Sequence, residues 1–136
     1  MGLDMKLYAV EDPDLILDEE ETPYEVWVSL KSWYWRKANA IHQWFVANVQ
    51  NEEDDCGVYE VSHDQLKRLT VDVNWVLMFP EEAEDYLPTQ AGFFFGSQEY
   101  DQYYMDDLRT SAKYLKEALL LKEKNPDTRF FYCASW

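Results

Sequence analysis

The chain of 136 residues has only 4 glycines, 2 cysteines and no long apolar run. A membrane-spanning helix needs roughly 20 mostly apolar residues, so we expect no membrane span. Residues 1–14 contain no basic stretch followed by an apolar one, and no signal peptide is therefore expected. These absences predict a soluble protein of the cytoplasm.

Cysteine is also too scarce to define a disulfide framework or a metal site. Cys56 and Cys133 lie far apart, and neither belongs to a CxxC pair. We expect two reduced thiols, as in most cytosolic proteins, and a single disulfide between them is the open alternative.

Basic residues are few: 12 Lys and Arg stand against 27 Asp and Glu, which gives a formal charge of −15. Proteins that hold DNA or RNA by a basic face need an excess of Lys and Arg, so direct nucleic-acid binding is not expected. Aromatic residues make up 17% of the chain, which excludes a disordered acidic tail. The length and the absence of repeats predict a single domain over residues 1–136.

The negative charge is concentrated in three short runs, at residues 18–21, 52–55 and 81–85. Each run lies between segments with regular apolar spacing, so we expect solvated loops. The alternative is that the runs align on one surface and imitate the phosphates of a nucleic acid.

Apolar spacing predicts the secondary structure. Alternation at period two predicts strands over residues 3–10 and 24–30, and short strands are also expected over residues 56–61 and 129–136. Spacing of three and four predicts helices over residues 32–49, 62–79 and 100–125. Ser62 and Gln65 form a capping-box pattern at the start of the second helix. Residues 86–97 are expected to form a loop or a short buried strand.

The resulting order, ββαβα–loop–αβ, predicts an α+β fold with a small, mainly antiparallel sheet packed against about three helices.

Patterns typical of catalysis are missing. The chain has no HExxH, no Cys cluster, no GxSxG and no phosphate-binding GxxxxGK[ST] loop. We therefore expect no metal, no cofactor and no enzymatic activity. A dyad of Cys56 or Cys133 with His42 is an open alternative, although nothing in the local sequence marks either thiol as activated.

The segment around residues 33–37 places two bases among three aromatic residues. On the predicted helix, Trp35 and His42 share a stripe, while Arg36 and Lys37 point about 100° apart. One interpretation is core packing with two solvated bases. The other is a pocket in which rings stack a planar group and a base neutralises a phosphate or carboxylate. The predicted ligand-binding residues are Trp35, Arg36, Lys37, His42, Thr89, Gln90, Tyr100 and Tyr104.

Three sequence blocks carry a resemblance. They are YWRKANAIHQWFVANVQ at residues 34–50, DDCGVYEVS at 54–62 and LPTQAGFFFGSQEYDQYY at 87–104, followed by an aromatic C-terminal strand. They resemble a widespread family of small uncharacterised phage and prophage proteins. Members are sometimes labelled phosphoglycerate kinase, but this chain lacks the nucleotide loop and the length of that enzyme. The resemblance implies a phage-encoded protein acting in the host bacterial cytoplasm, and it implies no settled activity.

Three functional hypotheses follow for such a protein. The first is an accessory protein that counters host defence by sequestering a small nucleotide-derived signal in an aromatic and basic pocket, which a homodimer would deepen. The alternative is an acidic nucleic-acid mimic, of the anti-CRISPR kind, that blocks a basic host nuclease by protein–protein binding. A virion or packaging component is the third hypothesis.

Overall fold

Four strands form one antiparallel sheet. The computed structural model describes residues 3–10, 31–89 and 99–136. The strands are β1 (Asp4–Val10), β2 (Ser32–Arg36), β3 (Val58–Val61) and β4 (Arg129–Ser135). Their order in the sheet is β2-β1-β4-β3, and each neighbouring pair is antiparallel. The C-terminal strand therefore lies in the interior of the sheet, next to the first.

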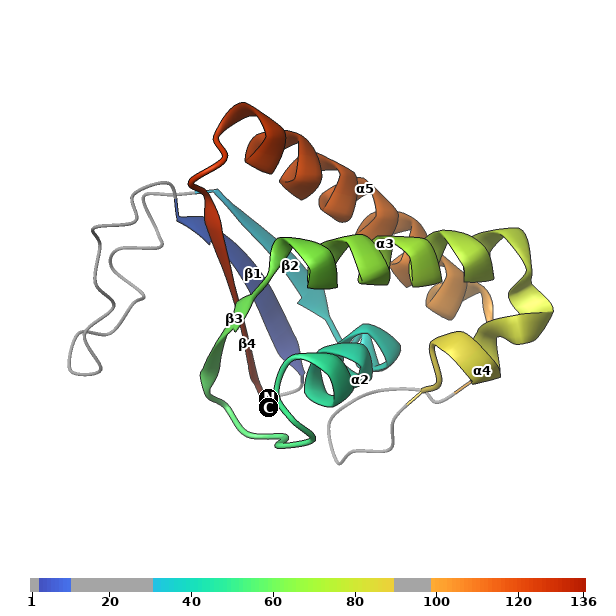
Figure 1. Cartoon of the computed structure of the whole chain (residues 1–136). Helices are drawn as coiled ribbons and strands as arrows, with labels where there is room; N and C mark the ends of the chain where they lie inside the picture. Colours follow the sequence, from blue (N-terminus) through green and yellow to red (C-terminus); the bar gives the residue numbers. More distant parts are fainter. Residues whose placement is uncertain (1–2, 11–30, 90–98) are drawn as a thin grey trace.

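The helices gather on one side of this sheet (Figure 1). They are α2 (Asn39–Asn48), α3 (His63–Met78), the 3-10 helix η1 (Pro80–Glu82), α4 (Ala83–Tyr86) and α5 (Gln102–Lys124). The long helices α3 and α5 pack against each other. An antiparallel sheet covered by helices is an α+β fold, so the predicted fold class is confirmed. Within the described ranges, no helix is both long and apolar enough to cross a membrane.

The main core lies between the sheet and the helices. Every second residue of β1, β2 and β4 faces the helices, and these side chains are at most 5% exposed. Burying a large apolar side chain contributes roughly 1.5–3 kcal/mol. The core is built on Leu3, Met5, Leu7, Trp33, Trp35, Phe130 and Tyr132 from the sheet side, and on Phe45, Leu66, Leu69, Leu108 and Leu115 from the helices.

Residues 32–36 form strand β2, so the prediction of a helix starting at residue 32 was wrong. Trp33 and Trp35 are buried, whereas Ser32, Tyr34 and Arg36 are exposed. Trp33 pairs with Leu7 of β1, and Trp35 pairs with Met5. The apolar residues of this segment fit both the period of a strand and that of a helix. Aromatic side chains suit a half-buried strand, and the pairing with β1 selects the strand. The shared helical stripe proposed for Trp35 and His42 therefore does not exist.

The remaining boundaries agree with the sequence more closely. The capping box is present: Gln65 donates its backbone N–H to Ser62 Oγ at 3.1 Å, and Ser62 donates its own to Gln65 Oε1 at 2.8 Å. Strand β3 begins at Val58, two residues later than predicted. The acidic run 81–85, predicted as a loop, forms η1 and α4. The predicted strand 24–30 and residues 90–97 of the predicted loop lie outside the described residues.

Candidate functional site

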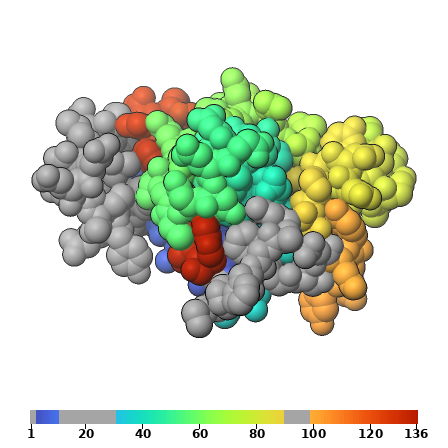
Figure 2. Space-filling model, turned by 90° about the horizontal axis from the view of Figure 1, so that it is seen from below, coloured from blue at the N-terminus to red at the C-terminus, as the bar shows by residue number. Residues whose placement is uncertain are grey.

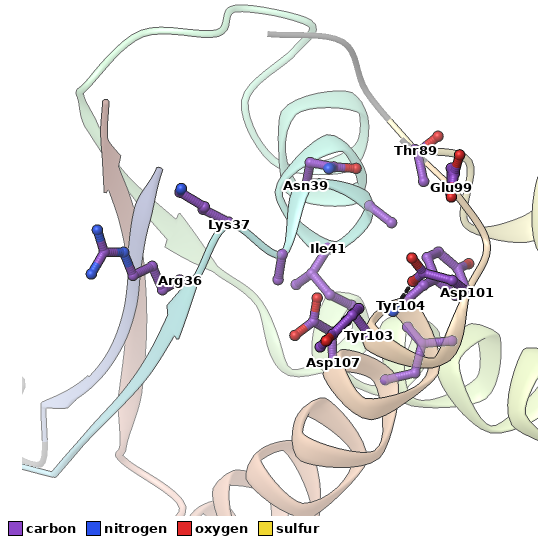
Figure 3. Close-up of a pocket in the computed structure, with 13 residues that line it drawn as sticks. Arg36, Lys37, Asn39, Ile41, Thr89, Glu99, Asp101, Tyr103, Tyr104 and Asp107 are labelled. Carbon is purple, nitrogen blue, oxygen red and sulfur yellow. Dashed lines mark hydrogen bonds between the residues drawn. The ribbon is translucent and has the colours of Figure 1, made fainter. Parts of the chain in front are cut away.

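A cavity of about 290 Å³ lies where the connection from β2 to α2 meets the first turns of α5 (Figure 3). Two of the blocks noted in the sequence, 34–50 and 87–104, contribute to its walls. The lining residues are Arg36, Lys37, Ala38, Asn39, Ala40, Ile41, Thr89, Glu99, Asp101, Tyr103, Tyr104, Asp107 and Leu108.

A tight turn at Lys37 forms one wall of the cavity. Lys37 has a φ of 56°, in the left-handed region, which ends β2 and turns the chain into α2. Its N–H donates to Leu3 O at 2.7 Å, and its carbonyl accepts from Asn39 N–H at 2.9 Å. Residues other than glycine adopt this backbone conformation at a cost of roughly 1–2 kcal/mol. The turn therefore fixes the backbone of Arg36 and Lys37 beside the cavity.

The start of α5 forms the opposite wall. The Asp101 carboxylate caps the helix by accepting the Tyr104 N–H at 3.1 Å. Tyr104 donates its hydroxyl to Leu87 O at 2.7 Å, and the Thr89 N–H donates to the Tyr100 hydroxyl at 3.2 Å. These bonds tie residues 87–89 to α5 and keep the cavity wall in place.

Carboxyl groups dominate the electrostatics of the cavity. Glu99, Asp101 and Asp107 line it, against Arg36 and Lys37. In Figure 3 the side chains of both bases point away from the Asp107 carboxylate. The interior is therefore acidic, and the positive charge lies at the rim.

Asp107 is the most perturbed carboxyl of the cavity. Burial, followed by repulsion from Asp106 and Asp101, raises its pKa to about 6. Its carboxylate makes no hydrogen bond or ion pair with another residue of the described ranges. A half-buried acid without a partner, facing a cavity, is typical of a binding or catalytic position.

Four of the eight predicted site residues line the cavity: Arg36, Lys37, Thr89 and Tyr104. Tyr100 lies beside it through its bond to Thr89. Gln90 lies outside the described residues. The prediction was wrong for Trp35 and His42, which lie in the core.

Trp35 is a core residue of β2. It is 3% exposed, and its indole N–H donates to Ser111 Oγ at 2.8 Å. Its ring packs edge-on against Tyr114, with 5.2 Å between ring centroids. Because both its ring and its N–H are occupied, Trp35 cannot stack a ligand.

His42 forms the centre of a buried polar chain. It is fully buried, its Nδ1 lies 2.7 Å from the Tyr132 hydroxyl, and its Nε2 lies 2.7 Å from Asp54 Oδ1. Burial lowers the pKa of His42, and the bond to Asp54 opposes that effect. The geometry supports the interpretation of His42 as a core residue. It also leaves neither ring nitrogen to activate a thiol, so a Cys–His dyad has no support.

The cysteines are not paired: Cys56 is exposed, Cys133 is half-buried, and both are free. Burial raises the pKa of the Cys133 thiol. Among the residues that the structure describes, no group of three or more His, Cys, Asp or Glu side chains is arranged to hold a metal ion.

The eight predicted residues did not include Asn39, Glu99, Asp101, Tyr103 or Asp107, which also line the cavity. A usable signal existed for one pair, because Tyr103 and Asp107 lie four residues apart on the predicted third helix and so share a face. The cavity itself required the long-range contact between α5 and the β2–α2 turn, which no local pattern reveals.

The chain matches no known family model, no curated protein and no solved structure. The resemblance to a phage protein family therefore stays a prediction, and the chemistry of the cavity is the main guide to function.

Proposed function

We propose that the protein acts by binding and that the cavity takes one small nucleotide-like molecule. Acting in the host bacterial cytoplasm, as the resemblance implies, it would keep a nucleotide-derived signal from a host defence system. The observation that carries the proposal is the partnerless Asp107 carboxylate, which faces a cavity built from two separate sequence blocks.

The acidic interior suits a nucleobase. A carboxylate accepts two N–H donors from the edge of a planar ring, and such charge-assisted bonds are roughly twice as strong as neutral ones. Tyr103 lies one turn before Asp107 and is 78% exposed, so its ring is available for stacking. Asp107 and Tyr103 thus provide the two kinds of contact that a base needs.

The rim suits a phosphate. Lys37 lies at the mouth of the cavity and points away from the carboxylates, so a phosphate attached to a bound base would reach it without entering the acidic interior. Arg36 also lines the cavity, but its side chain shares the exposed face of β2 with Tyr34 and leads away from the cavity. The cavity volume of about 290 Å³ is at the low end of the roughly 300–1,000 Å³ found for small-molecule sites. This volume favours a mononucleotide over a dinucleotide or ADP-ribose.

Calorimetric titration of the whole chain tests this proposal. The panel contains the four ribonucleoside monophosphates, their 3′,5′-cyclic forms, a cyclic dinucleotide and ADP-ribose. We expect one mononucleotide to bind, and Asp107→Asn to weaken it by about tenfold or more, because a hydrogen bond to a charged group contributes roughly 1.5–3 kcal/mol.

Asp127→Asn, which removes an exposed carboxylate after α5, is the matched control and should bind like the wild type. Absence of binding across the panel, or equal binding by the wild type and Asp107→Asn, would contradict the proposal. Native mass spectrometry of the same samples reports the subunit number and so tests the expected homodimer.

The acidic mimic is the second candidate function, and its support is confined to one of the three runs. Run 18–21 lies outside the described residues. In run 52–55, Asp54 bonds His42, and Asp55 accepts from the Gly57 N–H at 2.9 Å and the Tyr59 hydroxyl at 2.8 Å. Two of these four carboxylates are therefore engaged within the chain. In run 81–85, Glu82 accepts the Trp75 indole N–H, and the other three carboxylates, those of Glu81, Glu84 and Asp85, make no such bond within the described residues.

A further inference from the structure

One long segment of the chain carries no positive charge. From residue 69 to residue 108 the sequence contains nine Asp and Glu and no Lys or Arg. Four of the nine acids, Glu81, Glu82, Glu84 and Asp85, belong to η1 and α4. Figure 2 shows this part of the chain, in yellow, at one edge of the molecule. We call residues 75–86 the acidic tip.

The acidic tip also exposes large apolar side chains. Met78 is 70% exposed, Tyr86 is 42% exposed and Trp75 is 39% exposed. Single exposed apolar residues are ordinary, but these three lie together: Trp75 and Met78 are three residues apart on α3, and the Tyr86 ring lies beside the Trp75 ring. Trp, Tyr and Met are also the residues that protein–protein interfaces favour.

The aromatic rings of the tip are held in a defined arrangement. The Trp75 ring lies 4.7 Å from the Phe79 ring and 5.8 Å from the Tyr86 ring, between centroids. Trp75 donates its indole N–H to Glu82 Oε2. This bond fixes the indole, so the partly exposed ring and the surrounding carboxylates are presented together and little side-chain entropy is lost on binding.

We propose that the acidic tip is a docking surface for a basic protein that inserts an Arg or Lys side chain against Trp75. A guanidinium packs favourably over an indole face, and the four carboxylates would pair with further bases around it. The uniform negative charge would also speed the encounter with a positively charged partner.

The same chemistry argues against other occupants. A second copy docking through the same tip would bring four carboxylates onto four carboxylates. Nucleic acid and anionic lipid surfaces carry the same sign of charge as the tip and are repelled. The tip is also separate from the cavity, because none of residues 75–86 lines it.

Fluorescence anisotropy with a labelled peptide tests the proposal on the whole chain. The probe is a twelve-residue peptide of alternating Arg and Leu, and its control replaces every Arg with Glu. We expect saturable binding of the Arg peptide that weakens as salt is added, and no binding of the Glu peptide. Absence of saturable binding by the Arg peptide would overturn the proposal.

Two triple variants locate the binding. Glu81→Gln/Glu84→Gln/Asp85→Asn removes three charges from the tip. Glu52→Gln/Glu53→Gln/Asp127→Asn removes three exposed charges elsewhere, so the net charge of the two proteins is equal. We expect the first to raise the Kd about tenfold and the second to change it less than twofold. Equal weakening by both variants would mean that only net charge matters and would overturn the proposal.

A third variant tests the apolar part of the surface. Met78→Ser/Tyr86→Ser keeps every charge, and we expect it to weaken the Arg peptide at least threefold. Unchanged binding would refute a patch in which the apolar side chains take part. Asp107→Asn should bind the peptide like the wild type, so failure of the nucleotide proposal and failure of this one are distinguishable.

Discussion

The replacement of Asp107 by Asn is expected to stabilise the protein at neutral pH. The folded state raises the pKa of this carboxyl from 3.8 to about 6, so the ionised form is disfavoured by about two pH units. Each unit corresponds to about 1.4 kcal/mol, and partial solvent screening reduces the total. We expect Asp107→Asn to increase the free energy of unfolding by about 1–3 kcal/mol at pH 7.5.

The effect must depend on pH in one direction. Below pH 6 the folded carboxyl takes up a proton, and below pH 4 the unfolded chain does so as well. The advantage of the variant is therefore present above pH 6 and disappears as the pH falls toward 3.8. Urea unfolding at pH 7.5 and pH 4 measures the difference, with Asp127→Asn as the exposed control.

Two results would refute this reasoning. Unchanged stability of Asp107→Asn at pH 7.5 would mean that the carboxyl is well solvated and the cavity is open to water. A destabilised variant would mean that the ionised carboxylate has a favourable partner. Either result would remove the feature on which the binding proposal depends.

Three further predictions concern other parts of the fold. In the Asp107→Asn variant, the free energy of unfolding should fall as the pH drops from 7.5 to 5. The folded state lowers the pKa of His42, so over this range the unfolded chain binds a proton at His42 more readily than the folded protein does; His42→Gln should flatten the dependence. In urea unfolding, the free energy of unfolding of Lys37→Gly should equal that of the wild type or exceed it by up to about 1 kcal/mol, because glycine adopts the positive φ without strain, while the variant should bind the nucleotide more weakly. Equal loss of stability by Lys37→Gly and Lys37→Ala would contradict this. A thiol assay should count two free cysteines, with exposed Cys56 reacting well before Cys133, whose thiol pKa is raised; a disulfide-linked mass would contradict this.

The fold could be predicted largely because most segments follow a single period. The strand at residues 3–10 and the capping box at Ser62 are local patterns, and the structure confirms both. The segment 32–36 fits two periods: Trp33 and Trp35 alternate as in a strand, while Trp35 and His42 are spaced as on a helix. Pairing with β1 makes this segment a strand, and that pairing involves residues about 30 positions away.

About half of the candidate site could be predicted, because the sequence shows the type of each side chain but not its burial. Arg36 and Lys37 stood out as bases among aromatic residues, and both lie at the cavity. Trp35 and His42 carry the same kind of side chain as ligand-binding residues, and only their burial shows that they belong to the core. The raised pKa of Asp107 comes from its burial and from the nearby carboxylates of Asp106 and Asp101, and composition does not reveal that burial.

The most direct test of the cavity as a binding site is an NMR titration of the ¹⁵N-labelled whole chain with the mononucleotide that binds most tightly. We expect the largest amide shift changes on residues 36–41, 89 and 99–108, and none on β4. Changes concentrated on any other surface, or spread evenly over the chain, would contradict binding in the cavity.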